Sequence, residues 1–268
     1  MPNFLALSLE LRDIIYNFVL NAPDDAPPSS PADSGERRQS CEEIFHGCSV
    51  YFPQTVHISS AALLLINRQI HAEFAASIAR LKKSGRLRYK LDCMLYGEGW
   101  IYPTWLSVPV LSEGINVLEV DVRRARNPEG IGGGLMSKRE ADPDGCDPMI
   151  RCLWALLKRF LTRGPKFSSC EKDERRIEVG SLVLNVIDRS HDGEEMICRW
   201  DRSGDDDTRI DDIMAMMMHR EIGIVEIYDA IRYLVLTYSP PILERLKTLV
   251  LREDGWEFQR WNLEAVGP

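Results

Sequence analysis

The sequence lacks a hydrophobic run long enough to cross a membrane. Its longest purely apolar stretch, AALLLI at 61–66, is far shorter than the roughly 18 residues that a membrane-spanning helix needs. The amino-terminal end also lacks the pattern of a secretory signal peptide, because its first basic residue is Arg12 and the acidic Glu10 precedes it. We therefore expect no membrane partner and no secretion signal.

The chain also lacks an excess of basic residues. Its 268 residues include 33 Lys and Arg against 41 Asp and Glu, a formal net charge of −8. Nucleic acids and anionic membrane surfaces attract clustered Lys and Arg side chains, so this charge argues against both as partners. The 44% of hydrophobic residues suffices for one large domain, or for a small module and a larger domain.

Paired cysteine spacings are missing as well. The seven cysteines are an odd number and are spread without short paired spacings, so they do not form the disulfide framework of a small secreted domain. We expect mostly buried, reduced thiols and a cytoplasmic or nuclear location.

The motifs of catalysis and cofactor binding are incomplete or absent. GIGGG at 130–134 invites a phosphate-binding interpretation, but Leu135 stands where the dinucleotide pattern needs a glycine, and the Gly-Lys-Ser/Thr of the Walker pattern is missing. The chain has no G-x-S-x-G elbow for acyl transfer. The sequence predicts no catalytic residue and no cofactor. An enzyme with a pocket at the carboxyl ends of the strands is kept as a third alternative.

Metal-binding patterns are incomplete too. HAE at 71–73 matches the first half of a zinc deaminase signature, whose second half, Pro-Cys-x-x-Cys, is absent. The cysteines and histidines between 41 and 57 match no common zinc-finger spacing. The consecutive acids at 205–207 lack the alternation and the glycine of a calcium loop. We therefore predict no metal site.

What the sequence does contain, at its start, is an apolar stripe at helical spacing. The stretch FLALSLELRDIIYNFVL at 4–20 predicts an amphipathic helix, with Ser8 as its amino-terminal cap. The candidate protein-binding residues are the apolar members of this stripe: Leu7, Leu11, Ile14, Ile15, Phe18 and Val19. Such a helix must bury its stripe either in its own domain or in another protein.

A second helix is predicted after a polar insertion. Residues 21–43 hold four prolines and few apolar side chains, so we expect a disordered insertion there. The stretch 59–83 predicts one long helix, capped by Ser59 or Ser60 and ended by Gly85. Its predicted buried stripe consists of Leu63, Ile66, Ile70, Phe74, Ile78 and Leu81.

The remainder of the chain predicts a sheet with helices between its later strands. The predicted strands are 86–95, 116–122, 181–187 and 247–253, with 181–187 central, because it is apolar on both faces. The predicted helices 149–162 and 223–240 have the same apolar spacing, which fits either a duplicated helix–strand unit or the common template of amphipathic helices. Strand–helix–strand order favours parallel pairing.

These elements define the expected fold class and domains. We expect an α+β protein in which a helical module at 1–83, with its disordered insertion at 21–43, precedes an α/β domain at 84–268. That domain has a mostly parallel sheet of about four strands with flanking helices. Polar loops are expected at 123–148 and 188–212. The aromatics Trp100, Tyr102 and Trp105 are interpreted as packing a loop onto the core, with a recognition surface as the alternative.

Two amino-terminal motifs resemble a known family. LSLELRDIIYNFVL at 7–20 and LLLINRQIHAEFA at 63–75 resemble the F-box-like segment that opens many proteins of filamentous fungi. That segment reads Leu-Pro-x-Glu-Leu-Arg-x-x-Ile-Tyr, an insertion, then Leu-Leu-x-Asn-Arg-Gln-Ile-x-x-Glu. The resemblance covers about residues 4–80. The chain departs from the pattern at Ser8, where the family has proline, and serine caps the helix instead.

The resemblance implies a role in protein recognition. F-box helices dock onto a Skp-family adaptor of a cullin–RING ubiquitin ligase, and the carboxy-terminal domain holds a protein substrate, here unknown. The physical mode would be an apolar helix face in a groove. The alternative is a self-contained, non-catalytic interaction protein in which Ile14 and Phe18 pack against Ile66 and Ile70 within its own core.

Overall fold

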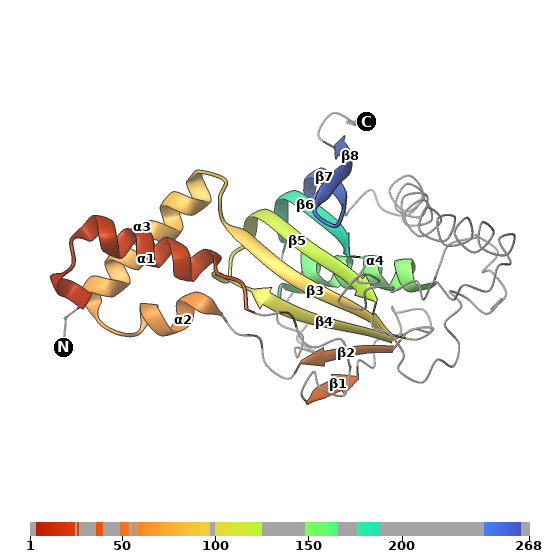
Figure 1. The fold of residues 1–268 in the computed structure, drawn as a ribbon, viewed down its shortest axis with the longest axis horizontal. Helices are drawn as coiled ribbons and strands as arrows, with labels where there is room; N and C mark the ends of the chain where they lie inside the picture. Colours follow the sequence, from red (N-terminus) through yellow and green to blue (C-terminus); the bar gives the residue numbers. More distant parts are fainter. Residues whose placement is uncertain are drawn as a thin grey trace, which may run out of the picture.

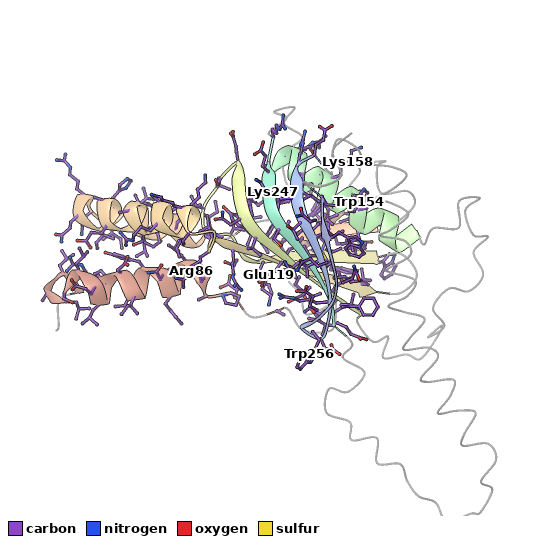
Figure 2. All side chains as sticks on the ribbon, turned by 90° about the horizontal axis from the view of Figure 1, so that it is seen from above. Arg86, Glu119, Trp154, Lys158, Lys247 and Trp256 are labelled. Atoms are coloured by element: carbon purple, nitrogen blue, oxygen red, sulfur yellow. The ribbon has the colours of Figure 1, made fainter. Side chains whose placement is uncertain are left out.

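The computed structural model combines helices and a mixed sheet in an α+β fold (Figure 1). It describes residues 4–24, 26, 36–39, 49–53, 56, 58–96, 100–124, 148–165, 176–187 and 244–263. Three helices lie together at one end of the sheet, and a fourth covers one of its faces (Figures 1 and 2). The predicted helix 223–240, the predicted loop 188–212 and residues 125–147 of the predicted loop 123–148 lie outside the described residues.

The first helix forms where the apolar spacing predicts it. After the 3-10 turn η1 (Phe4–Ala6), helix α1 spans Leu9–Asn21. Ser8 is its N-cap, and the Ser8 hydroxyl accepts a hydrogen bond from the Leu11 amide at 3.5 Å. Ser8 therefore begins the helix by capping it.

The predicted long helix 59–83 is in fact two helices. Helix α2 spans Ser59–Leu64, and helix α3 spans Arg68–Lys83. The break comes at Asn67, whose side chain accepts a hydrogen bond from the Ile70 amide at 2.9 Å and so caps α3. The prediction of Ser59 or Ser60 as the cap of a single helix was wrong, because the continuous apolar spacing hid an asparagine cap within it.

Helix α3 ends as predicted, at the glycine. Gly85 has a φ of +70°, a conformation that costs a residue without Cβ little. The Arg86 amide donates to the Leu81 carbonyl at 2.9 Å, and the Gly85 amide donates to the Lys82 carbonyl at 3.2 Å. This pair of bonds is a Schellman motif, which turns the chain directly from α3 into the sheet.

The described residues form an eight-stranded sheet in the order β1-β2-β4-β3-β5-β6-β7-β8. Neighbours pair in parallel at β2–β4, β3–β5, β5–β6 and β6–β7, and antiparallel at β1–β2, β3–β4 and β7–β8. The strands are β1 (Arg37–Gln39), β2 (Ser49–Pro53), β3 (Arg88–Tyr96), β4 (Trp100–Ser107), β5 (Gly114–Arg124), β6 (Glu178–Ile187), β7 (Leu246–Glu253) and β8 (Trp256–Asn262).

The four predicted strands exist and are consecutive parallel neighbours, β3-β5-β6-β7. The predicted central position of 181–187 is confirmed, since β6 lies between β5 and β7. The expected count of about four strands was too low, because β1, β2, β4 and β8 extend the sheet at both edges. Strands β1 and β2 are short, and β1–β2, β3–β4 and β7–β8 are antiparallel pairs that strand–helix–strand order does not signal.

Part of the predicted disordered insertion is a strand. Arg37, at the start of β1, donates from Nη1 to the carbonyls of Tyr51 and Pro103 at 3.1 and 3.0 Å, and from Nη2 to the Thr104 hydroxyl at 2.6 Å. This guanidinium ties β1 to β2 and β4. Strands β1 and β2 thus belong to the sheet although they precede residue 83, so the predicted boundary at 83/84 does not separate helices from strands.

Helix α4 (Pro148–Arg163) packs on one face of the sheet as the spacing of its apolar residues predicts. The aromatic stretch 97–109, predicted as a loop, contains strand β4. Tyr102 and Trp105 are buried, which agrees with the core-packing interpretation, whereas Trp100 is about half exposed. The Trp105 indole donates from Nε1 to the Pro165 carbonyl at 3.0 Å and links the sheet to the segment after α4.

A buried ion pair joins the two central strands β3 and β5. Arg123 donates from Nε and Nη2 to the two carboxylate oxygens of Asp92 at 2.6 and 3.0 Å, and both side chains are almost fully buried. Lys90 and Asp121 pair across the same strands at 3.0 Å. A buried pair of this kind fixes strand register, because a shift would leave a charge without its counter-ion.

This buried pair yields a stability prediction. Replacing Asp92 by Leu leaves the Arg123 guanidinium buried without its carboxylate, so we expect a loss of about 3 to 5 kcal/mol in the free energy of unfolding. The double variant Asp92→Leu with Arg123→Leu should lose less than the two single losses added together. Urea denaturation followed by circular dichroism measures each value.

The exposed pair Arg88–Glu119 lies on the same two strands and provides the control. Its disruption by Arg88→Ala should cost under about 1 kcal/mol, because water screens exposed charges. If the double variant lost as much stability as the two single variants together, Asp92 and Arg123 would not be energetically coupled, and the prediction would be contradicted.

Candidate protein-binding surface

Helix α1 turns a partly polar face toward the protein and an apolar face outward. Its buried residues are Arg12, Tyr16 and Leu20. Tyr16 packs edge-on against the Phe74 ring of α3, with a centroid distance of 5.3 Å, and Leu20 belongs to the same core cluster. An arginine on the buried side of a short helix requires a charged partner there.

That partner is Glu73 of α3. The Arg12 guanidinium donates from Nε and Nη2 to the two Glu73 carboxylate oxygens at 2.8 and 2.7 Å, a bidentate pair. Arg12 Nη1 also donates to the carbonyls of Leu5 and Leu7. The single side chain of Arg12 thus fixes both the turn before α1 and the position of α1 on α3.

The Glu73 carboxylate collects two further donors. The Tyr16 hydroxyl donates to Oε2 at 3.0 Å, and the Gln69 amide donates from Nε2 to Oε1 at 2.9 Å. The hydrogen bonds from Arg12 and then Gln69 lower the pKa of Glu73 from 4.5 to about 2. Burial raises the pKa of Tyr16. Glu73 is therefore ionised at neutral pH, and its charge is the centre of the contact between the two helices.

A second polar contact joins Asp13, the next residue of α1, to α3 one turn beyond Glu73. The Ser77 hydroxyl donates to the Asp13 carboxylate, and the Arg80 guanidinium pairs with the same carboxylate. Arg80 also donates from Nη2 to the Ser77 hydroxyl at 3.0 Å. The inner side of α1 is held by hydrogen bonds along its length, and these bonds have geometric requirements that apolar packing lacks.

These contacts explain the two motifs of the sequence. Arg12 and Tyr16 come from the first motif, Glu73 and Gln69 come from the second, and the four side chains meet in one hydrogen-bonded network. Asn67 of the second motif caps α3. These polar residues of the two motifs therefore hold the amino-terminal helices together.

Most apolar residues of the first motif are exposed, whereas Leu20 is buried. We call Leu11, Ile14, Ile15 and Phe18 the outer stripe, since their i, i+3, i+4, i+7 spacing places them on one face of the helix. Their exposed fractions are 50%, 64%, 38% and 73%. The other two candidate residues, Leu7 and Val19, are partly buried beside it.

The arrangement required by the self-contained alternative is not the observed one. That alternative places Ile14 and Phe18 against Ile66 and Ile70, yet Ile14, Phe18 and Ile66 are all more than half exposed and only Ile70 is buried. Ile66 leaves the predicted stripe of 59–83 because the chain turns between α2 and α3 at this point.

The sequence interpretation also missed exposed apolar residues in the turn between α2 and α3. Leu65 is 85% exposed and Ile66 is 56% exposed, both in the turn between α2 and α3. In Figure 1 this turn and the amino terminus lie at the same end of the helices. The Asn67 cap, with the apolar run just before it, is the signal that marks such a turn.

Comparison with protein-family models, with curated proteins and with solved structures finds no match to this chain. The function of the outer stripe must therefore be inferred from its own residues and contacts. Exposed apolar patches on proteins mark contacts with other proteins, with membranes or with ligands.

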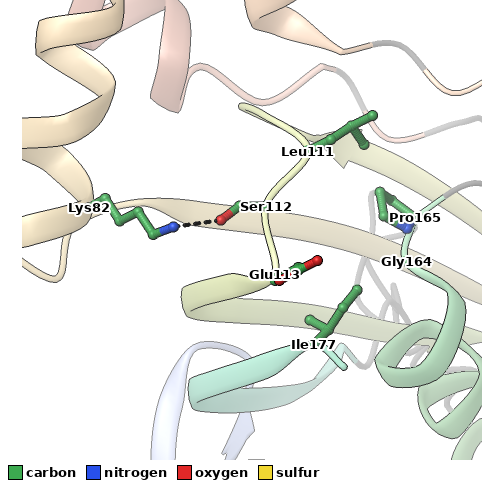
Figure 3. A pocket seen from close by; sticks show the side chains of 7 residues that line it. All are labelled: Lys82, Leu111, Ser112, Glu113, Gly164, Pro165 and Ile177. Carbon is green, nitrogen blue, oxygen red and sulfur yellow. Dashed lines mark hydrogen bonds between the residues drawn. The ribbon is translucent and has the colours of Figure 1, made fainter. Parts of the chain in front are cut away.

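A pocket of about 330 Å³ lies between the end of α3, the β4–β5 connection and the segments flanking the α4–β6 connection (Figure 3). The Lys82 ammonium donates to the Ser112 hydroxyl at 2.8 Å across it, and Ser112 bonds the backbone of Gly114. These polar groups hydrogen-bond to one another and so connect α3 to the β4–β5 connection. The lining residues are Lys82, Leu111, Ser112, Glu113, Gly164, Pro165 and Ile177.

Metal and cysteine chemistry receives little support in the part of the chain that the structure describes. No group of three or more His, Cys, Asp and Glu side chains is close enough there to hold a metal ion. Burial raises the pKa of the Cys93 thiol well above its ordinary value, so Cys93 stays protonated. The cysteines and histidines between 41 and 57, the glycines of 130–134 and the acids at 205–207 lie outside the described residues. None of the described helices is long and apolar enough to cross a membrane.

The depressed pKa of Glu73 gives a prediction about acid stability. The pKa of Glu73 is about 2 in the folded chain against 4.5 ordinarily. The ionised carboxylate therefore stabilises the fold fully above about pH 4.5, and this stabilisation is lost as pH falls toward 2. The difference in stability between the wild type and Glu73→Gln should be constant above about pH 5 and shrink below it. Urea denaturation at a series of pH values measures this difference.

Glu119 offers a matched control, because its pair with Arg88 is exposed. The difference between the wild type and Glu119→Gln should be small at every pH. A Glu73 difference that grows as the pH falls would contradict the assignment of its depressed pKa to Arg12 and Gln69.

Proposed function

We propose that this chain is a protein-interaction module of the F-box-like kind, a substrate receptor that links a target protein to a cullin–RING ubiquitin ligase. The outer stripe of α1 would dock into a groove of a Skp-family adaptor. The sheet would hold the target, a protein of unknown identity. The observation that carries the proposal is the outward apolar face of α1 in a helix whose inner face is already fully engaged.

The energetics of the outer stripe support the proposal. Fully burying a large apolar side chain contributes about 1.5 to 3 kcal/mol relative to exposure. Leu11, Ile14 and Phe18 are each at least half exposed, so a partner gains a substantial part of this free energy at each. That sum reaches only the lower end of the translational and rotational cost of association, so a specific complex needs neighbouring residues to add to the stripe.

The rigidity of the stripe supports it as well. Arg12 and Asp13 tie one turn of α1 to two successive turns of α3, at Glu73 and at Ser77. A partner therefore meets a helix that is already formed and oriented, and association does not have to order it. Preorganisation of this kind strengthens binding without any additional contact.

The two ends of the molecule could bind different proteins, an adaptor at the helices and a target at the sheet. Helices α1, α2 and α3 lie at one end of the sheet, and the carboxyl ends of β3 and β5 point away from them (Figure 1). Open sheets with parallel strands commonly bind ligands beyond the carboxyl ends of those strands. An adaptor and a target could thus be held at opposite ends.

A paired substitution on the outer stripe tests the adaptor. Leu11→Asp with Ile15→Asp places two carboxylates on the face that would enter an apolar groove, so we expect loss of at least about 99% of the affinity for a purified Skp-family adaptor, or about 3 kcal/mol. Pull-down and isothermal titration measure the loss. Circular dichroism should show an unchanged fold, because both side chains point outward.

The matched control carries the same charges on another helix. Ala72 and Ala76 are exposed on α3 at the same four-residue spacing, so Ala72→Asp with Ala76→Asp should keep adaptor binding. Unfolding of the Leu11/Ile15 variant would favour the self-contained alternative, in which these residues belong to the protein's own core. A folded wild-type chain that binds no Skp-family adaptor would refute the proposed function.

A further inference from the structure

The pocket beside the end of α3 has a buried apolar floor and a charged rim (Figure 3). Pro165 and Ile177 are buried, and Leu111, which is 37% exposed, lines the pocket from the β4–β5 connection. Lys82 and Glu113 are exposed and bring opposite charges to it. Its volume of about 330 Å³ lies at the small end of the range for ligand pockets, so its occupant is a small molecule.

The walls of the pocket are held in place by backbone hydrogen bonds. The Ile177 amide donates to the Leu161 carbonyl of α4 at 3.1 Å. The Glu178 amide donates to the Glu113 carbonyl at 2.8 Å and ties the β4–β5 connection to the start of β6. Gly164 turns the chain at the end of α4 with a φ of +81°, a conformation that glycine adopts at little cost. The pocket is therefore formed in advance of any ligand, as small-molecule sites usually are.

The Lys82 ammonium is oriented at the rim and keeps donors for a ligand. It donates to the Ser112 hydroxyl at 2.8 Å. That hydroxyl accepts from the Gly114 amide at 3.2 Å and donates to the Gly114 carbonyl at 2.9 Å, so Ser112 is itself fixed. In the described part of the chain Lys82 makes this one hydrogen bond, and two of the three N–H donors of its ammonium remain. Such donors bind a carboxylate strongly.

The Glu113 carboxylate supplies the opposite charge. The ion pairs among the described residues include neither Glu113 nor Lys82. In the view of Figure 3 Glu113 lies between Lys82 and the apolar side chains of the pocket. A ligand with a carboxylate alone is repelled by Glu113, and a ligand with an ammonium alone is repelled by Lys82. A ligand that carries both charges is attracted by both residues.

We infer that this pocket binds a small zwitterion, an α-amino acid with an apolar side chain. The ligand carboxylate accepts hydrogen bonds from Lys82, and the ligand ammonium donates to Glu113. Its side chain lies against Leu111, Pro165 and Ile177, where it removes apolar surface from water. The inference does not depend on the proposed function, because no residue of the outer stripe lines the pocket.

Isothermal titration of the full chain with three compounds of the same carbon skeleton tests the role of the two charges. L-Leucine carries both charges, isocaproate lacks the ammonium, and isoamylamine lacks the carboxylate. We expect saturable binding of one L-leucine per chain. The other two compounds should bind at least about tenfold more weakly, because each loses one charge-assisted hydrogen bond. This comparison uses the wild type alone and so does not depend on the folding of a variant.

Two substitutions assign each ligand charge to a residue. Lys82→Met keeps a long side chain without its charge, so it should weaken L-leucine binding at least about tenfold and reduce the preference over isoamylamine. Glu113→Gln should weaken L-leucine binding similarly and reduce the preference over isocaproate. The control variants Lys83→Met and Glu178→Gln change exposed neighbours outside the lining and should bind L-leucine like the wild type. Circular dichroism should show the same fold for all four variants.

Several results would overturn the inference. One is a wild type that does not bind L-leucine saturably at millimolar concentrations. Another is a wild type that binds isocaproate or isoamylamine as tightly as L-leucine, because the pocket would then not recognise both charges. An L-leucine affinity that is unchanged in a folded Lys82→Met or Glu113→Gln chain, or that falls equally in the control variants, would place the binding elsewhere.

Discussion

The bidentate pair between Arg12 and Glu73 is the contact on which the amino-terminal architecture depends. It places a charged residue of α1 on the inside and thereby turns the apolar residues of the same helix outward. A helix positioned by hydrophobic burial alone would rotate to cover Ile14 and Phe18. The directional hydrogen bonds of Arg12, Tyr16 and Asp13 oppose that rotation, so the exposed stripe is a consequence of the buried polar contact.

A buried ion pair also positions the first central strands of the sheet. The Schellman turn at Gly85 leads from α3 into β3, and β3 is linked to β5 by the buried pair of Asp92 and Arg123. Tyr16, Leu20 and Phe74 belong to the same core cluster as the inner residues of the strands. The helices are therefore a firmly seated end of one structure.

The sequence predicts the parts of this structure that have regular spacing. The four central strands, α1 with its Ser8 cap and α4 all follow from apolar periodicity. Two features escaped it for physical reasons: the Asn67 cap interrupts a run that stays apolar, and β1 is held by the hydrogen bonds of Arg37 rather than by burial. For the surface, periodicity identified the stripe on α1 but not the side it faces, because that side is decided by Arg12 and a glutamate 61 residues away.

The most direct test of the central claim is hydroxyl-radical footprinting of the intact chain, alone and with a Skp-family adaptor. If the polar contact holds the apolar face outward, Phe18 and Ile14 of the isolated chain are modified strongly, Tyr16 is modified weakly, and the adaptor protects Phe18 and Ile14. Equal protection of Phe18 and Tyr16 in the isolated chain would show that the stripe is already enclosed by its own protein, and would contradict the account.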